Sequence, residues 1–189
     1  MQVRRILSNN PDINLFTKGE SMLHQAAVAG HTEVAQLLID FKAPLNHRNK
    51  DGQTPAHVAA DAGYAELVET LWRAGADLEQ HAADGSTPVL AASRKGHAAV
   101  IKILQMAGAD LDSIGENGST AMLVSAANGA TSVIEVLLKV STSYIKRSRL
   151  RHTNSNGETP YYVAAAGGSV QLNVRGDGET GGYCSCAAF

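Results

Sequence analysis

A spacing of 33 residues recurs along this 189-residue chain and constrains its fold more than any other feature. The clearest markers are two series of glycines in which each member follows the previous one at this spacing. The two series are Gly19, Gly52, Gly85 and Gly118, and Gly30, Gly63, Gly96 and Gly129. A fixed period of about 20 to 50 residues is typical of a solenoid, in which each repeat packs on its neighbours. The spacing therefore predicts a stack of similar units.

The second copy indicates what each unit contains. After a glycine turn, Thr54 suits the N-cap of a helix, Pro55 suits its first position, and His57 is placed to reach back to the cap. We expect this helix to be short and to end at Gly63 in the left-handed conformation. A second helix is expected over residues 65–73, with its apolar residues on one face. Each copy is thus predicted to hold two helices and an extended stretch that leads to the next turn.

The motifs around these helices resemble the ankyrin repeat. They are threonine–proline pairs at helix starts, glycine–histidine pairs between helices, and Gly-Ala-Asp runs after second helices. The residues that carry the resemblance are Thr54-Pro55-Ala56-His57, Thr87-Pro88, Gly30-His31, Gly96-His97, Gly75-Ala76-Asp77 and Gly108-Ala109-Asp110. The resemblance covers about residues 17–168. It implies an all-α ankyrin-repeat solenoid of stacked helix–turn–helix units with hairpin-like turns.

Two kinds of substitution depart from this pattern. Met22 and Ala121 stand where other copies have proline. Leu90 and Leu123 stand where other copies have histidine. We expect these copies to be less well capped, while the fold is retained.

Both ends of the predicted array are irregular. Residues 17–168 are expected to hold four full repeats and the first helix of a fifth, with a basic insertion at about 140–155. Residues 1–16 are interpreted as the second helix and exit loop of a partial repeat. Residues 169–189 are a glycine-rich tail that we expect to be disordered. Neither end has the features of a regular capping repeat. One interpretation is that the chain is a piece of a longer array, or a splice or frameshift product of one. The alternative is a divergent cap that is still sufficient.

No arrangement of residues points to catalysis. The seven histidines and two cysteines do not have the spacing of a zinc site. Because His24 and His57 occupy one repeat position, we expect them to form structural hydrogen bonds. Residues 176–181 match G-x-G-x-x-G, but no strand is expected before them and no helix after them, so a dinucleotide site is not expected. We therefore expect a protein that is not an enzyme, with no metal, cofactor or small-molecule substrate.

Polar residues occupy the turns and the first helices, where packing does not restrict them. The resemblance implies that these positions line a concave groove that binds a partner protein. The candidate residues are Lys50, Asp51, Gln53, Asp61, Asp84, Ser86, Arg94, Lys95, Glu116, Asn117, Ser119 and Asn128. Arg94 is the first candidate for a hot spot, because arginine is enriched at such positions. The alternative is a solvated face without a partner.

A basic cluster lies in the insertion between the fourth and fifth copies. Its cationic residues are Lys146, Arg147, Arg149 and Arg151. We expect a loop that projects from the array and is simply solvated. The alternatives are binding of acidic peptide, phospholipid headgroups or nucleic acid, and phosphorylation of Ser148. The net charge of −2 excludes a generally basic nucleic-acid binder, so nucleic acid is not an expected partner.

The last four residues, Cys186-Ala187-Ala188-Phe189, match a C-a-a-X box. They predict prenylation of Cys186 if the box is used, and a chance match is the alternative. No stretch of about 18 apolar residues is present, so we expect membrane association only through such a lipid.

Together these observations predict a monomeric adaptor or scaffold that binds another protein. The alternatives are a membrane-anchored adaptor prenylated at Cys186, and a regulatory fragment of a larger protein. Two cysteines and the absence of a secretion signal favour the cytoplasm, with nuclear or membrane-associated locations as alternatives.

Overall fold

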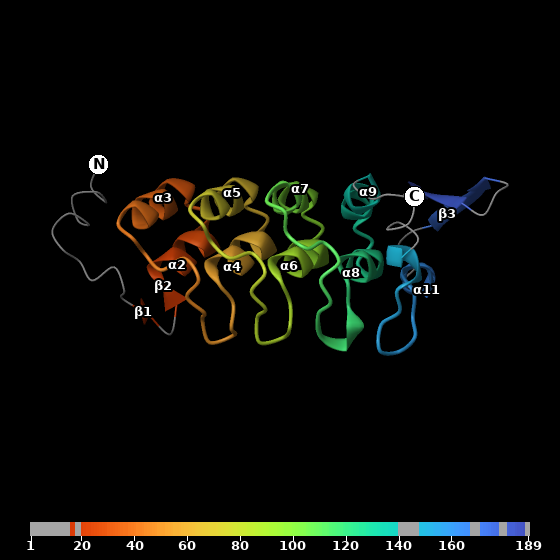
Figure 1. The fold of residues 1–189 in the computed structure, drawn as a ribbon, viewed down its shortest axis with the longest axis horizontal. Helices are drawn as coiled ribbons and strands as arrows, with labels where there is room; N and C mark the ends of the chain where they lie inside the picture. Colours follow the sequence, from red (N-terminus) through yellow and green to blue (C-terminus); the bar gives the residue numbers. More distant parts are fainter. Residues whose placement is uncertain (1–15, 18–19, 140–147, 167–170, 178–180, 188–189) are drawn as a thin grey trace.

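The computed structural model describes residues 16–17, 20–139, 148–166, 171–177 and 181–187. Its helices form two rows, and loops project from one of them (Figure 1). The row next to the loops holds the first helix of each repeat: α2 (Met22–Ala29), α4 (Pro55–Ala62), α6 (Pro88–Lys95), α8 (Ala121–Ala127) and α11 (Pro160–Ala166). The other row holds the second helices: α3 (Thr32–Asp40), α5 (Ala65–Arg73), α7 (Ala98–Met106) and α9 (Thr131–Lys139). Neighbours in each row are in contact, which confirms the all-α solenoid.

The second repeat follows the local pattern predicted for it. Helix α4 begins at Pro55, after the N-cap Thr54, and ends at Ala62, with Gly63 at φ 83° as its C-cap. Helix α5 begins at Ala65 and ends at Arg73, as predicted. Local capping residues therefore set the helix bounds.

The loops between repeats are hairpin-like, as predicted, and are called fingers below. In the first finger, the Asn49 amide donates to the Gln53 carbonyl at 2.9 Å. The next two fingers have the equivalent bonds, from Ala82 to Ser86 and from Gly115 to Ser119. A short 3-10 helix, η1 (Glu116–Gly118), forms the tip of the third finger. Backbone hydrogen bonds thus close each of these three fingers.

Small and aliphatic residues fill the core between the two rows. Ala59 and Ala92 on the first helices and Leu71 and Leu104 on the second helices are fully buried members of one apolar cluster. Alanine at the first-helix positions lets neighbouring helices approach closely. This explains how a chain with 5% aromatic residues builds a continuous core.

The glycine between the two helices of a repeat has two roles. At Gly63 the backbone is in the left-handed region, where glycine is favoured. A Cβ there would also lie 2.7 Å from the ring of His97 in the next repeat. The glycine therefore ends a helix and admits the neighbouring repeat.

The two ends contain short strands. Strand β1 (Phe16–Thr17) pairs with β2 (Glu20–Ser21) in antiparallel fashion. The helix predicted within residues 1–16 lies outside the described residues.

The expected disorder of residues 169–189 is corrected in the described part of this tail. Strands β3 (Gln171–Asp177) and β4 (Gly181–Ala187) form an antiparallel hairpin. Leu172 and Val174 alternate with polar residues in β3, which is a strand pattern. The sequence interpretation gave more weight to the glycines.

Candidate functional site

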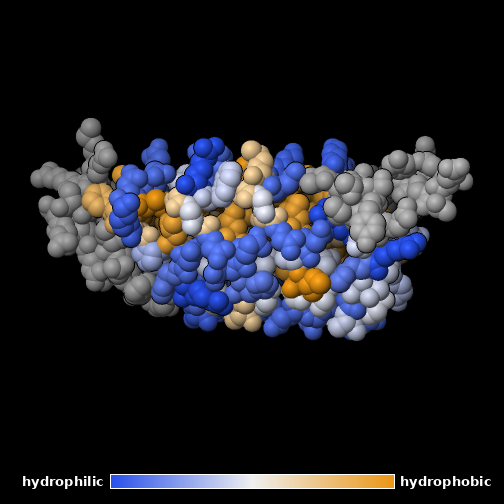
Figure 2. Space-filling view, in the orientation of Figure 1, coloured by the Kyte–Doolittle hydropathy of each residue, from blue (hydrophilic) through white to orange (hydrophobic). Residues whose placement is uncertain are grey.

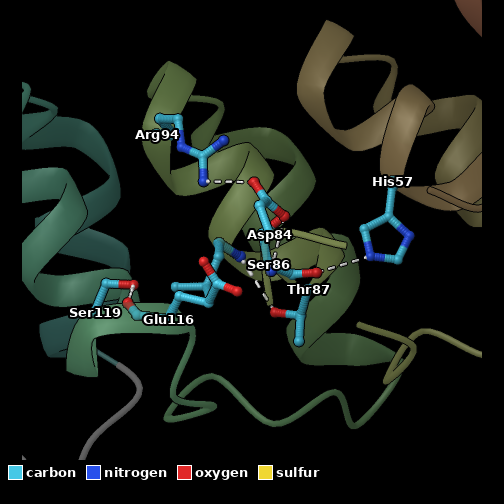
Figure 3. Close-up of polar contacts among 8 residues, drawn as sticks. His57, Asp84, Ser86, Thr87, Arg94, Glu116 and Ser119 are labelled. Carbon is cyan, nitrogen blue, oxygen red and sulfur yellow. Dashed lines mark hydrogen bonds and ion pairs between the residues drawn. The ribbon is translucent and has the colours of Figure 1, made fainter. Parts of the chain in front are cut away.

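Buried histidines join the first three repeats beneath the fingers. The Nδ1 atom of His57 accepts bonds from the Thr54 amide at 3.2 Å and the Thr54 hydroxyl at 2.9 Å. Its Nε2–H donates to the Ser86 carbonyl of the next finger at 3.0 Å (Figure 3). His24 makes the same set of bonds to Ser21 and to the Gln53 carbonyl. These residues have the structural role predicted for them.

Burial lowers the pKa of both histidines below the ordinary 6.5, and the bonds to the carbonyls oppose this effect only in part. The neutral ring is the form that fits, because Nδ1 must accept while Nε2 donates. The two histidines therefore provide uncharged bridges between repeats.

A carboxylate and a guanidinium meet between the second finger and helix α6. Asp84 Oδ1 accepts from the Ser86 amide at 3.0 Å and the Ser86 hydroxyl at 2.5 Å, and Arg94 Nη2 lies 3.5 Å from Asp84 Oδ2 (Figure 3). The Ser86 hydroxyl is the main cause of a lowered pKa for Asp84, with smaller effects from the Ser86 amide and Arg94. About half of each charged side chain is exposed. Asp84 is thus anchored by its own finger, while Arg94 is held weakly.

Several other candidate residues are also exposed at finger tips and helix ends. With Asp84 and Arg94 they form what we call the finger–helix face. Its members are Lys50, Asp51, Asp84, Arg94, Lys95, Glu116, Asn117 and Asn128. Hydrophilic residues likewise cover much of the side of the molecule seen in Figure 2.

Ser86 is a correction to the predicted site. It is 3% exposed, and its carbonyl accepts bonds from His57 and from the Ala82 amide. Ser86 therefore lies buried at the base of its finger, where its carbonyl and hydroxyl bond within the protein.

Gln53 and Ser119 occupy the repeat position of Ser86, one period before it and one period after it. Both are half-buried, and their carbonyls pair within their own fingers. Asp61 is also half-buried, and its carbonyl accepts from His97 Nε2 at 3.0 Å. The backbone carbonyls of these residues therefore stabilise the repeat structure.

The sequence interpretation missed Val28, which is 56% exposed near the end of α2. It precedes Asp61 by one period and Arg94 by two. Extending the repeat register back by one copy would have found it.

Comparison with known proteins agrees with this architecture. A family model described as ankyrin repeats, in three copies, matches residues 2–82 and 89–174. The chain belongs to the ankyrin-repeat family. A search of the curated proteins found no match. Ankyrin repeats are generally protein–protein interaction modules.

The insertion of this ankyrin array also differs from the prediction of a projecting loop. Arg149 does not project from the molecule: it is 8% exposed, and it lies in a helical turn over residues 148–151. Its Nε and Nη2 atoms donate to the two carboxylate oxygens of Asp112, and Nη1 donates to the Leu137 carbonyl. Arg151 is exposed, whereas Lys146 and Arg147 lie outside the described residues.

The repeat register explains why Arg149 is turned inward. Asn46 and Glu79 occupy one repeat position, and each side chain accepts the backbone amide of an aspartate in the next repeat. Asp112 is the next member of this series, and Ser143, one period after Asp110, lies outside the described residues. Among the described residues, the Arg149 guanidinium donates to Asp112.

In the described ranges, no group of three or more histidine, cysteine, aspartate or glutamate side chains is placed to hold a metal ion. Cys186 lies in strand β4, where its backbone pairs with Leu172, and its prenylation stays a prediction. Among the described helices, none is long and apolar enough to span a membrane.

Proposed function

We propose that this ankyrin-repeat protein is a non-catalytic adaptor that binds a partner protein through the finger–helix face. The observation that carries the proposal is the Asp84–Arg94 pair, which places a half-exposed guanidinium between a finger and a first helix. Arginine in such a position supplies both charge and contact area to an interface.

The frame beneath this face favours binding without a large ordering cost. The fingers are closed by backbone hydrogen bonds, and neighbouring fingers are linked as well: the Ala83 amide donates to the Asp51 carbonyl at 2.9 Å. A preformed surface loses little conformational entropy when a partner docks. An interface of ordinary size would cover roughly 800 Å² of this chain.

Affinity capture from cell lysate followed by mass spectrometry tests the proposal. The face variant changes six exposed residues to alanine: Lys50, Asp51, Arg94, Lys95, Glu116 and Asn117. The control variant changes six exposed residues of the second helices, with the same number of cations and anions: Glu33, Gln36, Arg73, Lys102, Glu135 and Lys139. Circular dichroism should show both variants folded, because exposed substitutions usually change stability little.

We expect a protein that the wild type and the control variant retain and the face variant loses. Equal retention by all three would place binding elsewhere on the molecule. Retention of nothing specific by the wild type would contradict the adaptor function.

A further inference from the structure

Four residues of the first helices share one repeat position and differ in chemistry. They are Val28 in α2, Asp61 in α4, Arg94 in α6 and Ala127 in α8, and we call them the inner row. Because these helices contact one another in this order, the inner row runs along the array. Its sequence of properties is apolar, acidic, basic and small.

The side chains of this row are accessible. Val28 is 56% exposed, Ala127 is exposed and Asp61 is half-buried. In the described ranges the Asp61 carboxylate forms no ion pair. The Arg94 side chain is 47% exposed, and its ion pair with Asp84 is long, at 3.5 Å.

Arg94 can also leave its present partner at low cost. Asp84 keeps two hydrogen bonds from Ser86 when the guanidinium moves away (Figure 3). A half-exposed ion pair contributes little, so an anionic group on a partner can replace it. The inner row thus offers a carboxylate and an exchangeable guanidinium in adjacent repeats.

We propose that the partner presents an extended peptide segment that complements the inner row. It carries an apolar residue against Val28, a basic residue against Asp61 and an acidic residue against Arg94. The proposal rests on the proposed function, since it names the class of partner that the finger–helix face and the inner row would take.

Helix spacing determines the interval between these three residues. Packed helices lie about 8–10 Å apart. A polyproline II segment rises about 3.1 Å per residue with three residues per turn, so every third side chain faces the same way about 9 Å further on. The partner segment is therefore apolar, basic and acidic at intervals of three residues, in polyproline II conformation.

Other conformations predict other intervals. In a β-strand, residues two apart share a face but are only about 6.6 Å apart. In an α-helix, residues seven apart share a face about 10.5 Å apart. The interval itself thus distinguishes the proposed conformation from these alternatives.

Selection from a displayed library of random peptides tests the proposal, with the full chain as bait. The wild type should enrich the apolar, basic and acidic pattern at intervals of three. An Arg94→Glu bait should enrich a basic residue at the position that was acidic, and an Asp61→Lys bait should enrich an acidic residue at the position that was basic. The control bait Arg73→Glu changes an exposed arginine of a second helix, and it should enrich the wild-type pattern.

A binding titration gives the second readout. Replacement of the acidic residue of a selected peptide by alanine should weaken its binding to the wild type about tenfold. The same replacement should have little effect on binding to the Arg94→Ala variant, because the paired group is already absent.

The outcomes separate this proposal from the proposed function. Two results would contradict the inner-row proposal and still leave the face as a binding site. In the first, peptides fail to bind the six-residue face variant, but the selected pattern does not change with either charge reversal. In the second, the selected peptides show an interval of seven residues. Peptides that bind the face variant as well as the wild type would contradict both. Failure to enrich any sequence would overturn the peptide proposal, while lysate capture still decides the adaptor function.

Discussion

The joints between repeats differ in the two halves of the array. In the first half, His24 and His57 bridge each N-cap to the next finger. In the second half, Leu90 and Leu123 occupy that position, and both are buried. The threonine N-cap there still accepts the helix amide: Leu90 donates to Thr87 Oγ1 at 3.4 Å. The first half of the stack thus has histidine bridges, whereas in the second half the Thr87 hydroxyl lies 3.0 Å from Ser113 Oγ at the next finger.

The second row of helices shows the same contrast. A Cβ on Gly63 would lie 2.7 Å from the His97 ring, whereas a Cβ on Gly96 would lie 3.5 Å from the Cβ of Ala130. The joint at Gly63 is therefore tighter than the joint at Gly96. The last joint uses side chains of the insertion: Arg149 bonds Asp112, and His152 Nε2 donates to the Gly118 carbonyl at 3.0 Å.

Removal of a histidine bridge should have the largest effect. We expect His57→Ala to lower the free energy of unfolding by about 3 kcal/mol, because it leaves a cavity, removes the acceptor of the Thr54 amide and removes one of the two donors to the Ser86 carbonyl. Urea denaturation measures the change. His81→Ala, at an exposed position, serves as the control and should cost less than about 0.5 kcal/mol. Equal stabilities of the two variants would show that the bridge contributes nothing.

Loss of Arg149 should weaken the last joint alone. Arg149→Ala leaves the Leu137 carbonyl without this donor. We expect the free energy of local unfolding at this joint to fall by about 2 kcal/mol. The loss is limited because Asp112 is half-exposed and water can solvate its carboxylate. Hydrogen exchange should become faster in α11 and stay unchanged in α2 and α4. The exposed Arg151→Ala is the matched control. A uniform rise along the array would contradict a local role.

Acid should destabilise the first half. The pKa of His24 and of His57 is lowered by burial, so below about pH 6.5 the unfolded chain binds protons that the folded chain does not. The free energy of unfolding therefore falls as the pH drops from about 6.5 toward the pKa of these histidines in the folded state. Each histidine contributes at most about 1.4 kcal/mol per pH unit to this loss. Urea denaturation at several pH values measures the slope.

The second half of the array, which has leucine in place of these histidines, provides the control for this pH dependence. Leu90→His should add acid sensitivity, and His57→Leu should remove part of it. A slope that neither substitution changes would assign the acid effect to other groups.

The smallest difference concerns the two glycines. Gly63→Ala and Gly96→Ala face similar backbone strain, since the φ values are 83° and 79°. Gly63→Ala must also displace the His97 ring, so we expect it to cost about 1 kcal/mol more. Thermal unfolding of the two variants measures the difference. Equal costs would mean that the His97 ring moves freely.

Part of the candidate site followed from the repeat register and part did not. Arg94 and Asp84 are exposed as predicted, because turn tips and first-helix ends carry no packing role in any copy. The prediction that Ser86 is exposed was wrong, because its burial depends on His57 of the preceding repeat. The prediction that Arg149 projects into solvent was also wrong. It followed the general rule that runs of charged residues are solvated. Nothing near Arg149 in the sequence indicates its partner Asp112, which precedes it by 37 residues.

The amino-acid sequence by itself determined the period, the helix bounds and the N-caps. These depend on residues a few positions apart, such as Thr54 and His57, so local patterns are sufficient to predict them. Only the tertiary structure decided which polar residues face outward and how the array continues across its insertion. Both depend on contacts between neighbouring repeats, about one period apart in sequence, where burial and bonding partners are set by the stack.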